Sequence, residues 1–331
     1  MIHEAMRDIY ERLKAAGYTP SFVRSLLPDW WEDKFAEVPS SRAYAEGVIA
    51  RQLRLELSSL RDKHAKLQPQ LHGGVRLKHR RGETDDDFTV AVTLGSRLAT
   101  IASLCLDTPA QVDGLNAASI RKQILDTGAP WVGFSELLDY CWQVGIPVTS
   151  LRKLPQGARK PDGMAVWTES RPAIVISSAR RQPAWHLFIL AHELGHLVKK
   201  HIKQGEVGVD SDVKAQMTST RKDEIEANAF AVELLSGDPN ISFSPPGCRL
   251  NATQLANAAR SIGQQLRIDP GFIALSYSRS QGFIPVGAAA LNEISPTTDA
   301  CALYRRFYER LDMDELAEDN QRAFEVLTEA A

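Results

Sequence analysis

Helical periodicity dominates the distribution of apolar residues along the chain. It predicts helices over 3–16, from Pro20 to about 28, 41–53, 85–104, 115–127, 135–144, 252–266, from Asp269 onward, 300–308 and 313–328. Three β-branched or apolar runs, bounded by Gly, Pro or charge, predict strands at 146–151, 164–168 and 173–177. The expected fold class is therefore α+β, mostly helical, with a small sheet flanked by helical regions on both sides.

The segment Ala191–His196 reads H-E-x-x-H inside an apolar stripe of helical spacing. Residues i and i+4 share one helix face, so His192 and His196 can direct two imidazoles at one metal ion. Glu193 lies one step round the helix, where it reaches a metal-bound water rather than the metal. Two ligands, one general base and one open position are typical of zinc peptidases. A bare H-E-x-x-H also occurs by chance, so a further ligand must be found.

A second helical segment, 223–235, offers that ligand. Glu224 and Asn228 are four residues apart and face the same way, so one can bind the metal while the other holds a ligand histidine. Glu226 points about 200° away from Glu224, so the two cannot both be ligands. We take Glu224 as the ligand, Asn228 as the support and Glu226 as the second candidate. The alternative is that both glutamates are solvated charges.

These two motifs resemble those of the ImmA/IrrE-type metallopeptidases, over about residues 130 to 240. The resemblance rests on His192-Glu193-Leu194-Gly195-His196 and on Glu224-x-Glu226-Ala227-Asn228-x-Phe230-Ala231. It implies a zincin-like sheet, a Zn²⁺ ion held by His192, His196 and Glu224, and Glu193 as general base. It also implies a substrate that is a helix-turn-helix repressor or an antitoxin-like partner. The proline expected soon after the second motif comes slightly late, at Pro239.

Composition places the chain among ordinary globular proteins. Of 331 residues, 44% are hydrophobic and 24% are charged, with a net charge of −2. The four cysteines are widely spaced and include no C-x-x-C pair, which argues against a thiolate zinc site or a disulfide framework. No signal peptide and no membrane-length apolar run is evident. We therefore expect a cytoplasmic protein without a membrane partner.

The N-terminal region is basic, with 15 Lys and Arg against 10 Asp and Glu over residues 1–82. Short helices with a basic excess resemble a helix-turn-helix module. We favour a degenerate module that contacts protein; DNA binding through residues 1–82 is possible but not favoured. Trp30 and Trp31 are expected to fill a small core with Phe35. The rival function is a DNA-binding transcriptional regulator that uses the peptidase fold as a metal or partner sensor without cleavage.

The sequence divides into four expected regions. They are a helix-turn-helix-like region at 1–70, a helical connector at 75–128, the zinc peptidase domain at 130–240 and a helical region at 241–331. Residues 205–220 are polar and contain glycine, so we expect a mobile loop there, and His201 is expected at the surface. One edge of the sheet is expected to accept the substrate as an added strand. Cys248 is expected to be structural.

Overall fold

The computed structural model describes residues 4–70, 75–78, 85–210, 222–243 and 249–329. The helices are α1 Glu4–Ala15, α2 Pro20–Ser25, the 3₁₀ helix η1 Asp33–Glu37, α3 Pro39–Gln52, α4 Leu57–Arg61, α5 Asp85–Leu104, α6 Ala117–Asp126, α7 Phe134–Gln143, α8 Pro183–Val198, α10 Lys222–Ser236, α11 Ala252–Leu266, α12 Pro270–Ser280, α13 Ile284–Ile294, α14 Ala300–Tyr308 and α15 Glu318–Thr328. The strands are β1 Val75–Lys78, β2 Val148–Ser150, β3 Gly163–Trp167, β4 Pro172–Ile176 and β5 Val207–Asp210. The α+β, mostly helical class is confirmed.

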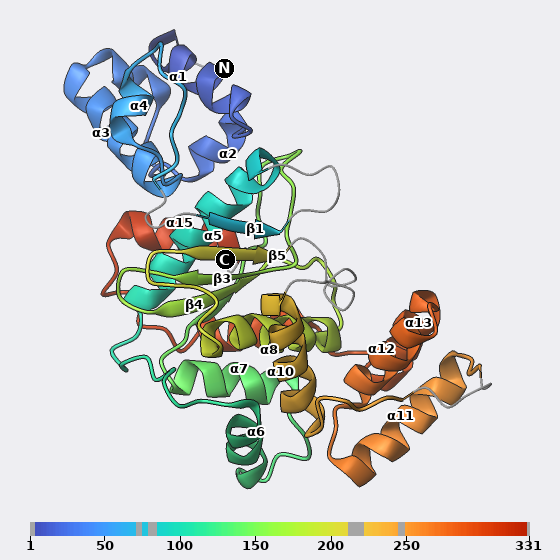
Figure 1. Cartoon of the computed structure of the whole chain (residues 1–331). Coiled ribbons are helices and arrows are strands. Elements are labelled where there is room, and N and C mark those ends of the chain that lie inside the picture. Colours follow the sequence, from blue (N-terminus) through green and yellow to red (C-terminus); the bar gives the residue numbers. More distant parts are fainter. Residues whose placement is uncertain (1–3, 71–74, 79–84, 211–221, 244–248, 330–331) are drawn as a thin grey trace.

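The five strands form one mixed sheet in the order β1-β5-β3-β4-β2 (Figure 1). β3 runs antiparallel to both β4 and β5, while β2 pairs with β4 and β1 pairs with β5 in parallel. The three expected strands are present. β1 and β5 were missed: β1 lies in the segment expected as a helical connector, and β5 in the segment expected as a loop. Residues 211–221 of that loop, and Cys248, lie outside the described residues.

Helices cover both faces of the sheet. A Cβ on Gly95 of α5 would meet Met164 and Val175, whereas a Cβ on Gly163 would meet Ile189 of α8. Because neighbouring residues of a strand face opposite ways, α5 and α8 lie on opposite faces. Figure 1 shows this layering, with α10 and α7 packed beside α8. The segment expected as a connector therefore supplies α5, a helix of the central core.

The β2 edge of the sheet is tied to the C-terminal helices. The backbone N–H of Ser150 donates to the Tyr308 hydroxyl at 2.8 Å, joining β2 to α14. The N–H groups of Arg152 and Lys153 both donate to the Leu327 carbonyl of α15, at 2.8 and 3.1 Å. The end of this edge is thus already hydrogen-bonded within the chain, and β1 forms the opposite edge.

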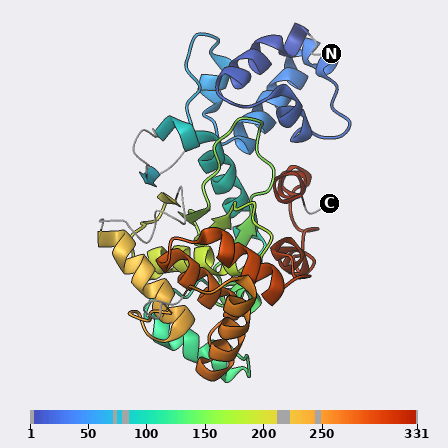
Figure 2. The ribbon, with the colours of Figure 1, turned by 90° about the vertical axis from the view of Figure 1, so that its right-hand side faces the viewer.

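The helices before and after the sheet form two further groups, seen in Figures 1 and 2. α1 to α4 form an N-terminal bundle above the sheet, and α11, α12 and α13 pack on one another, with α12 against α8. α13 was not predicted, because Pro285 and Gly287 are residue types that commonly end helices. Pro285 instead lies in the first turn, where its missing N–H is harmless, and a Cβ on Gly287 would lie 2.1 Å from Ser278 Oγ of α12.

The prediction for the paired tryptophans is wrong in part. Trp31 is partly buried against the core, but Trp30 is 55% exposed and stacks on Tyr44, itself 44% exposed, with ring centroids 5.6 Å apart. The N-terminal bundle therefore carries aromatic rings on its surface. The third helix also begins two residues before its expected start at residue 41, at Pro39.

One continuous apolar core runs from Met6 in α1 to Leu327 in α15. Bundle, sheet and C-terminal helices are joined through it, and the boundaries of the four expected regions stay predictions. Within the described part of the chain, no helix combines the length and the apolar character needed to span a bilayer.

Candidate metal centre

The first motif lies on α8, the most deeply buried helix of the site. Pro183 occupies its first turn, and every residue from Ala184 to Leu197 is buried between the sheet and the surrounding helices. His192 is fully buried and His196 is 6% exposed. As expected for positions i and i+4, the two imidazoles share one face, with Nε2 atoms 3.0 Å apart. Burial on all sides explains why the helix is almost entirely apolar; besides the residues of the site its buried polar side chain is His186, whose ring nitrogens contact the Tyr304 hydroxyl and the Arg180 carbonyl.

The second motif lies on α10, which crosses α8 closely at Gly195. A Cβ at Gly195 would lie 3.1 Å from both the Ala227 carbonyl oxygen and Phe230 Cδ1. A larger residue at this position would push the helices apart. The small residues Gly195 and Ala227 therefore set the spacing that lets carboxyl and amide side chains of α10 reach the histidines of α8.

Glu224 reaches both histidines. Its carboxylate oxygens lie 3.5 Å from His192 Nε2 and 3.2 Å from His196 Nε2, and its side chain is fully buried. One ligand atom from each of the three residues lies within 4.8 Å of the others, so the group can hold a metal ion. Tetrahedral zinc with bonds of 2.0–2.1 Å separates its ligand atoms by about 3.3 Å. The observed 3.0, 3.2 and 3.5 Å fit that spacing.

Asn228 lies beside His192, on the same face of α10 as Glu224, as the spacing of four residues predicts. Its Oδ1 is 3.0 Å from His192 Nδ1. An amide oxygen can only accept, so the Nδ1 atom carries the proton and Nε2 presents its lone pair toward Glu224 and His196. Asn228 thus fixes the tautomer of His192 that a metal ligand requires.

His196 is held in the same way, by His201. This contact contradicts the expectation that His201 lies at the surface. His201 Nδ1 lies 3.0 Å from His196 Nδ1, and His201 Nε2 lies 3.0 Å from Glu226 Oε2. The His201 side chain is only 11% exposed, so its expected surface position is wrong. The expectation considered only the α8 helix face, but α8 ends at Val198, and the turn after it brings His201 back under His196. The N–H of His201 donates to the His196 carbonyl oxygen at 2.9 Å.

Glu226 therefore faces His201 and not the group of three. The hydrogen bond from His201 lowers the pKa of the Glu226 carboxyl below its ordinary value. With a lone pair on Nε2 of His196, the proton sits on Nδ1 and is donated to His201 Nδ1. His201 then carries its own proton on Nε2, where Glu226 accepts it. One relay of hydrogen-bond donors and acceptors therefore runs from His196 through His201 to Glu226. It supports His196 as Asn228 supports His192.

Glu193 is buried between α8 and the start of β3. It is 1% exposed, and a Cβ on Gly163 would lie 2.6 Å from its Oε1 atom and 2.6 Å from Ile189 Cγ2. Any side chain at residue 163 would therefore displace Glu193 or the helix. Gly163 was not among the residues predicted for the site. It opens β3 and makes the room that Glu193 occupies.

The family model Peptidase_M78, described as the IrrE N-terminal-like domain, matches residues 143–236. The match runs from the end of α7 through β2–β5 and both motif helices, and ends with α10. No curated protein and no solved structure matches the chain. The family match and the buried group His192, His196 and Glu224 agree, and residues 143–236 are similar to the ImmA/IrrE-type peptidase domain.

Proposed function

We propose that the chain is a zinc-dependent endopeptidase with a regulatory role, which cleaves a helix-turn-helix repressor or an antitoxin-like partner. The convergence of His192, His196 and Glu224, with Glu193 buried beside them, supports this most directly. Two neutral imidazoles and one carboxylate are a donor set typical of catalytic zinc sites, which keep one position open.

Each residue has a defined part in the proposed chemistry. A bound zinc ion would lower the pKa of water toward roughly 7 and polarise the peptide carbonyl. Glu193 accepts the proton of the attacking water and delivers it to the leaving nitrogen. Asn228 holds His192, and His201 with Glu226 holds His196, so that both imidazoles keep their lone pairs directed at one point.

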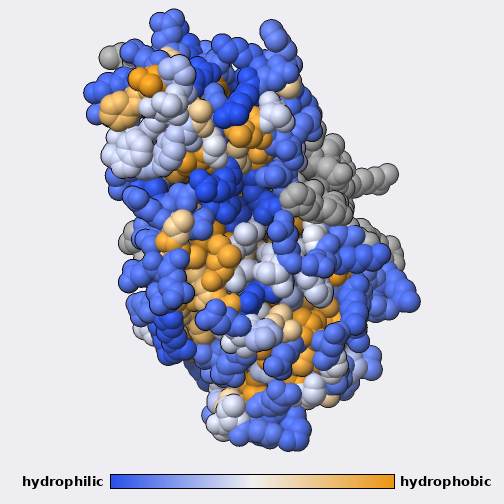
Figure 3. All heavy atoms as spheres, turned by 90° about the vertical axis from the view of Figure 1, so that its left-hand side faces the viewer, coloured by the Kyte–Doolittle hydropathy of each residue, from blue (hydrophilic) through white to orange (hydrophobic). Residues whose placement is uncertain are grey.

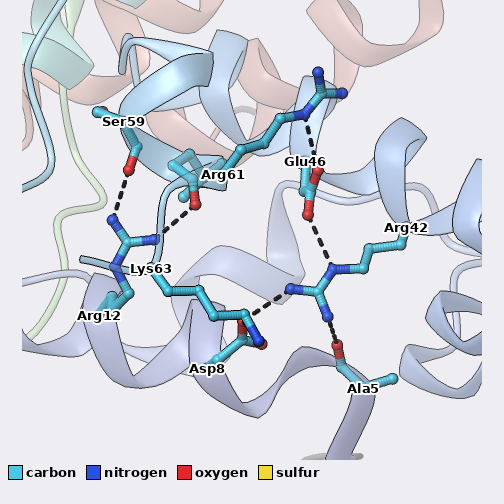
Figure 4. Close-up of polar contacts among 9 residues, drawn as sticks. Ala5, Asp8, Arg12, Arg42, Glu46, Ser59, Arg61 and Lys63 are labelled. Atoms are coloured by element: carbon cyan, nitrogen blue, oxygen red, sulfur yellow. Dashed lines mark hydrogen bonds and ion pairs between the residues drawn. The ribbon is translucent and has the colours of Figure 1, made fainter. Parts of the chain in front are cut away.

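The N-terminal bundle favours contact with a protein over contact with DNA. Several of its basic side chains form hydrogen bonds within the bundle, as Figure 4 shows. Arg42 bonds Asp8 and Glu46, Arg61 also bonds Glu46, and Lys63 pairs with Asp8. Cations paired in this way are poorly placed to neutralise DNA phosphates.

Two further observations point in the same direction. Arg12 donates to three backbone carbonyls, those of Ser59, Leu60 and Ala65, and so serves to hold the bundle together; Figure 4 shows its bond to Ser59. The exposed rings of Trp30 and Tyr44 add surface of the kind enriched where proteins bind one another. The substrate or a regulator of cleavage is therefore expected to dock on this bundle.

The rival function, a regulator that senses a partner or metal without cleaving, makes opposite predictions for one variant. In Glu193→Gln the amide cannot accept the proton of water, and loss of a general base costs about 10²–10⁴ in rate. The variant should keep its metal and its fold, still bind the repressor, and leave it intact. A sensor would signal normally through the same variant.

The test combines three measurements on wild type and Glu193→Gln. Metal content is measured on the purified proteins. The regulator encoded beside this protein is incubated with each purified protein, and its intact mass is then measured. Reporter output of the regulated genes is measured in cells. Loss of both cleavage and reporter output with retained metal supports the peptidase. Normal reporter output from a variant that yields no cleavage product would establish the sensor instead.

A further inference from the structure

A polar cavity of about 450 Å³ lies where the N-terminal bundle meets the sheet, away from the metal centre. Its walls come from the end of α3, the start of α4, α5 and the turn between β3 and β4. Three arginines, Arg51, Arg54 and Arg97, line it together with two carboxylates, Glu56 and Glu169. At this level Figure 3 shows a strongly hydrophilic band across the waist of the molecule.

Arg97 is the unusual member of this group. The residue is only 6% exposed, and its Nε and Nη2 atoms donate to neutral amide oxygens, those of Gln52 and Asn320. No carboxylate of the described residues lies within ion-pair distance, and Asp319 is the acid that attracts Arg97 from farther away. Burial lowers the pKa of Arg97 to about 10. A buried cation normally has an anionic partner, because removing it from water is costly.

Arg54 likewise donates its hydrogen bonds to neutral acceptors, with Glu169 as the nearby carboxylate. Its Nη1 donates to Thr100 Oγ1 at 3.0 Å and its Nε to the Gln70 carbonyl at 3.3 Å, both neutral acceptors. Arg51 differs, because it pairs with Asp319 at 2.8 Å. Two arginines of Figure 4, Arg42 and Arg61, also differ, because they pair with carboxylates of the bundle, whereas Arg12 donates to backbone carbonyls. Two guanidinium groups at one cavity thus donate their hydrogen bonds to neutral acceptors only, with Asp319 and Glu169 as the carboxylates that act on them from a longer distance.

A second pocket of about 230 Å³ adjoins the first, and Arg54 and Glu169 line both. It is more apolar, with Leu104, Val166 and Trp167 in its walls. Together the two pockets offer a cationic end and an apolar end. Their combined size is in the range of small-molecule sites.

The pockets are separate from the peptidase centre. Gly163, at one end of β3, borders Glu193, whereas Trp167, at the other end, lines the second pocket. Four strand steps of 3.3 Å separate them by about 13 Å. A ligand here would not be the peptide being cut, but it would contact the strand that positions the general base.

We infer that these pockets bind a small organic phosphate, with its phosphate group between Arg54 and Arg97 and its organic part in the apolar pocket beside Trp167. Guanidinium forks match the geometry and charge of a phosphate, and an aromatic and aliphatic wall suits a planar organic group. Because the site joins the N-terminal bundle to β3, its ligand is an effector of the domain.

Calorimetric titration of the full chain with AMP, inorganic phosphate and adenosine tests this. AMP should bind saturably at one site per chain, phosphate should compete with it, and adenosine should bind at least tenfold more weakly. Hydrogen bonds to charged groups contribute about 1.5–3 kcal/mol, so Arg97→Gln and Arg54→Asn should each weaken AMP binding by roughly tenfold or more. Asn tolerates the left-handed backbone at residue 54, where φ is 49°. Arg306→Gln, a change at an exposed arginine of α14, is the matched control.

Glu169→Gln keeps the test decisive if an arginine variant folds poorly. Removing this carboxylate, which faces Arg54, should strengthen AMP binding about threefold, and misfolding cannot produce a gain. The proposal is overturned if neither AMP nor phosphate binds saturably, if adenosine matches AMP, or if the arginine variants bind like Arg306→Gln. Binding of a DNA duplex, but of neither small probe, would also overturn it and assign the arginines to nucleic acid.

Discussion

Removing His201 should weaken metal binding although His201 touches no metal in the proposed site. His201→Ala deletes the acceptor for the Nδ1 proton of His196, and with it the link to Glu226. His196 then loses the contact that fixes its tautomer and ring orientation. Removal of such supports typically costs 10–100-fold in metal affinity, which corresponds to about 1.4–2.7 kcal/mol.

The structure also ranks a second variant. In Glu226→Gln the amide oxygen still accepts from His201 Nε2, so the geometry of the relay survives and only the charge is lost. The Glu226 side chain is 40% exposed, so we expect Glu226→Gln to lose much less zinc affinity than His201→Ala. His64→Ala is the matched control, because His64 is exposed and lies in the N-terminal bundle far from α8 in sequence.

The assay is competition for zinc against a chromophoric chelator at constant pH, with circular dichroism to verify the fold. It requires no knowledge of the substrate. The expected order of affinity is wild type and His64→Ala, then Glu226→Gln, then His201→Ala. Unchanged zinc affinity in a folded His201→Ala protein would refute the relay.

Three more predictions follow from other contacts. Glu224→Gln should lower zinc affinity sharply and Glu226→Gln should nearly preserve it; the reverse order in the same competition assay would make Glu226 the ligand. Gly163→Ala places a Cβ 2.6 Å from Glu193 Oε1, so cleavage should fall roughly 10²-fold while the zinc content stays unchanged; equal cleavage rates would show that this contact does not position the general base. Burial lowers the pKa of His186 to about 4 from 6.5, so its neutral form stabilises the fold above pH 6.5 and this stability is lost as the pH falls toward 4. Metal-free wild type should therefore lose about 2 kcal/mol of unfolding free energy between pH 7.5 and 5 that His186→Gln does not lose, as measured by urea denaturation; parallel curves would exclude the effect.

The metal-binding face could be predicted from the sequence because it depends on helix geometry alone. His192 and His196 share a face at i and i+4, and so do Glu224 and Asn228, in any helix that forms over these residues. Apolar residues at helical spacing were enough to predict α8 and α10, because α8 is buried on all sides along most of its length and α10 buries one face. The spacing of residues along a single helix can be interpreted without knowing which other elements the helix contacts.

Only the tertiary structure decided the rest, because it depends on contacts between residues far apart in sequence. β1 joins the sheet beside β5, about 130 residues later, and a strand of four residues carries too little pattern to predict that pairing. His201 reaches His196 through the backbone turn after α8, which a helical projection cannot represent. The room for Glu193 comes from Gly163 on another element, so the need for glycine is visible only where strand and helix meet. Local periodicity thus determined which side chains could bind a metal together, and packing determined what holds them in position.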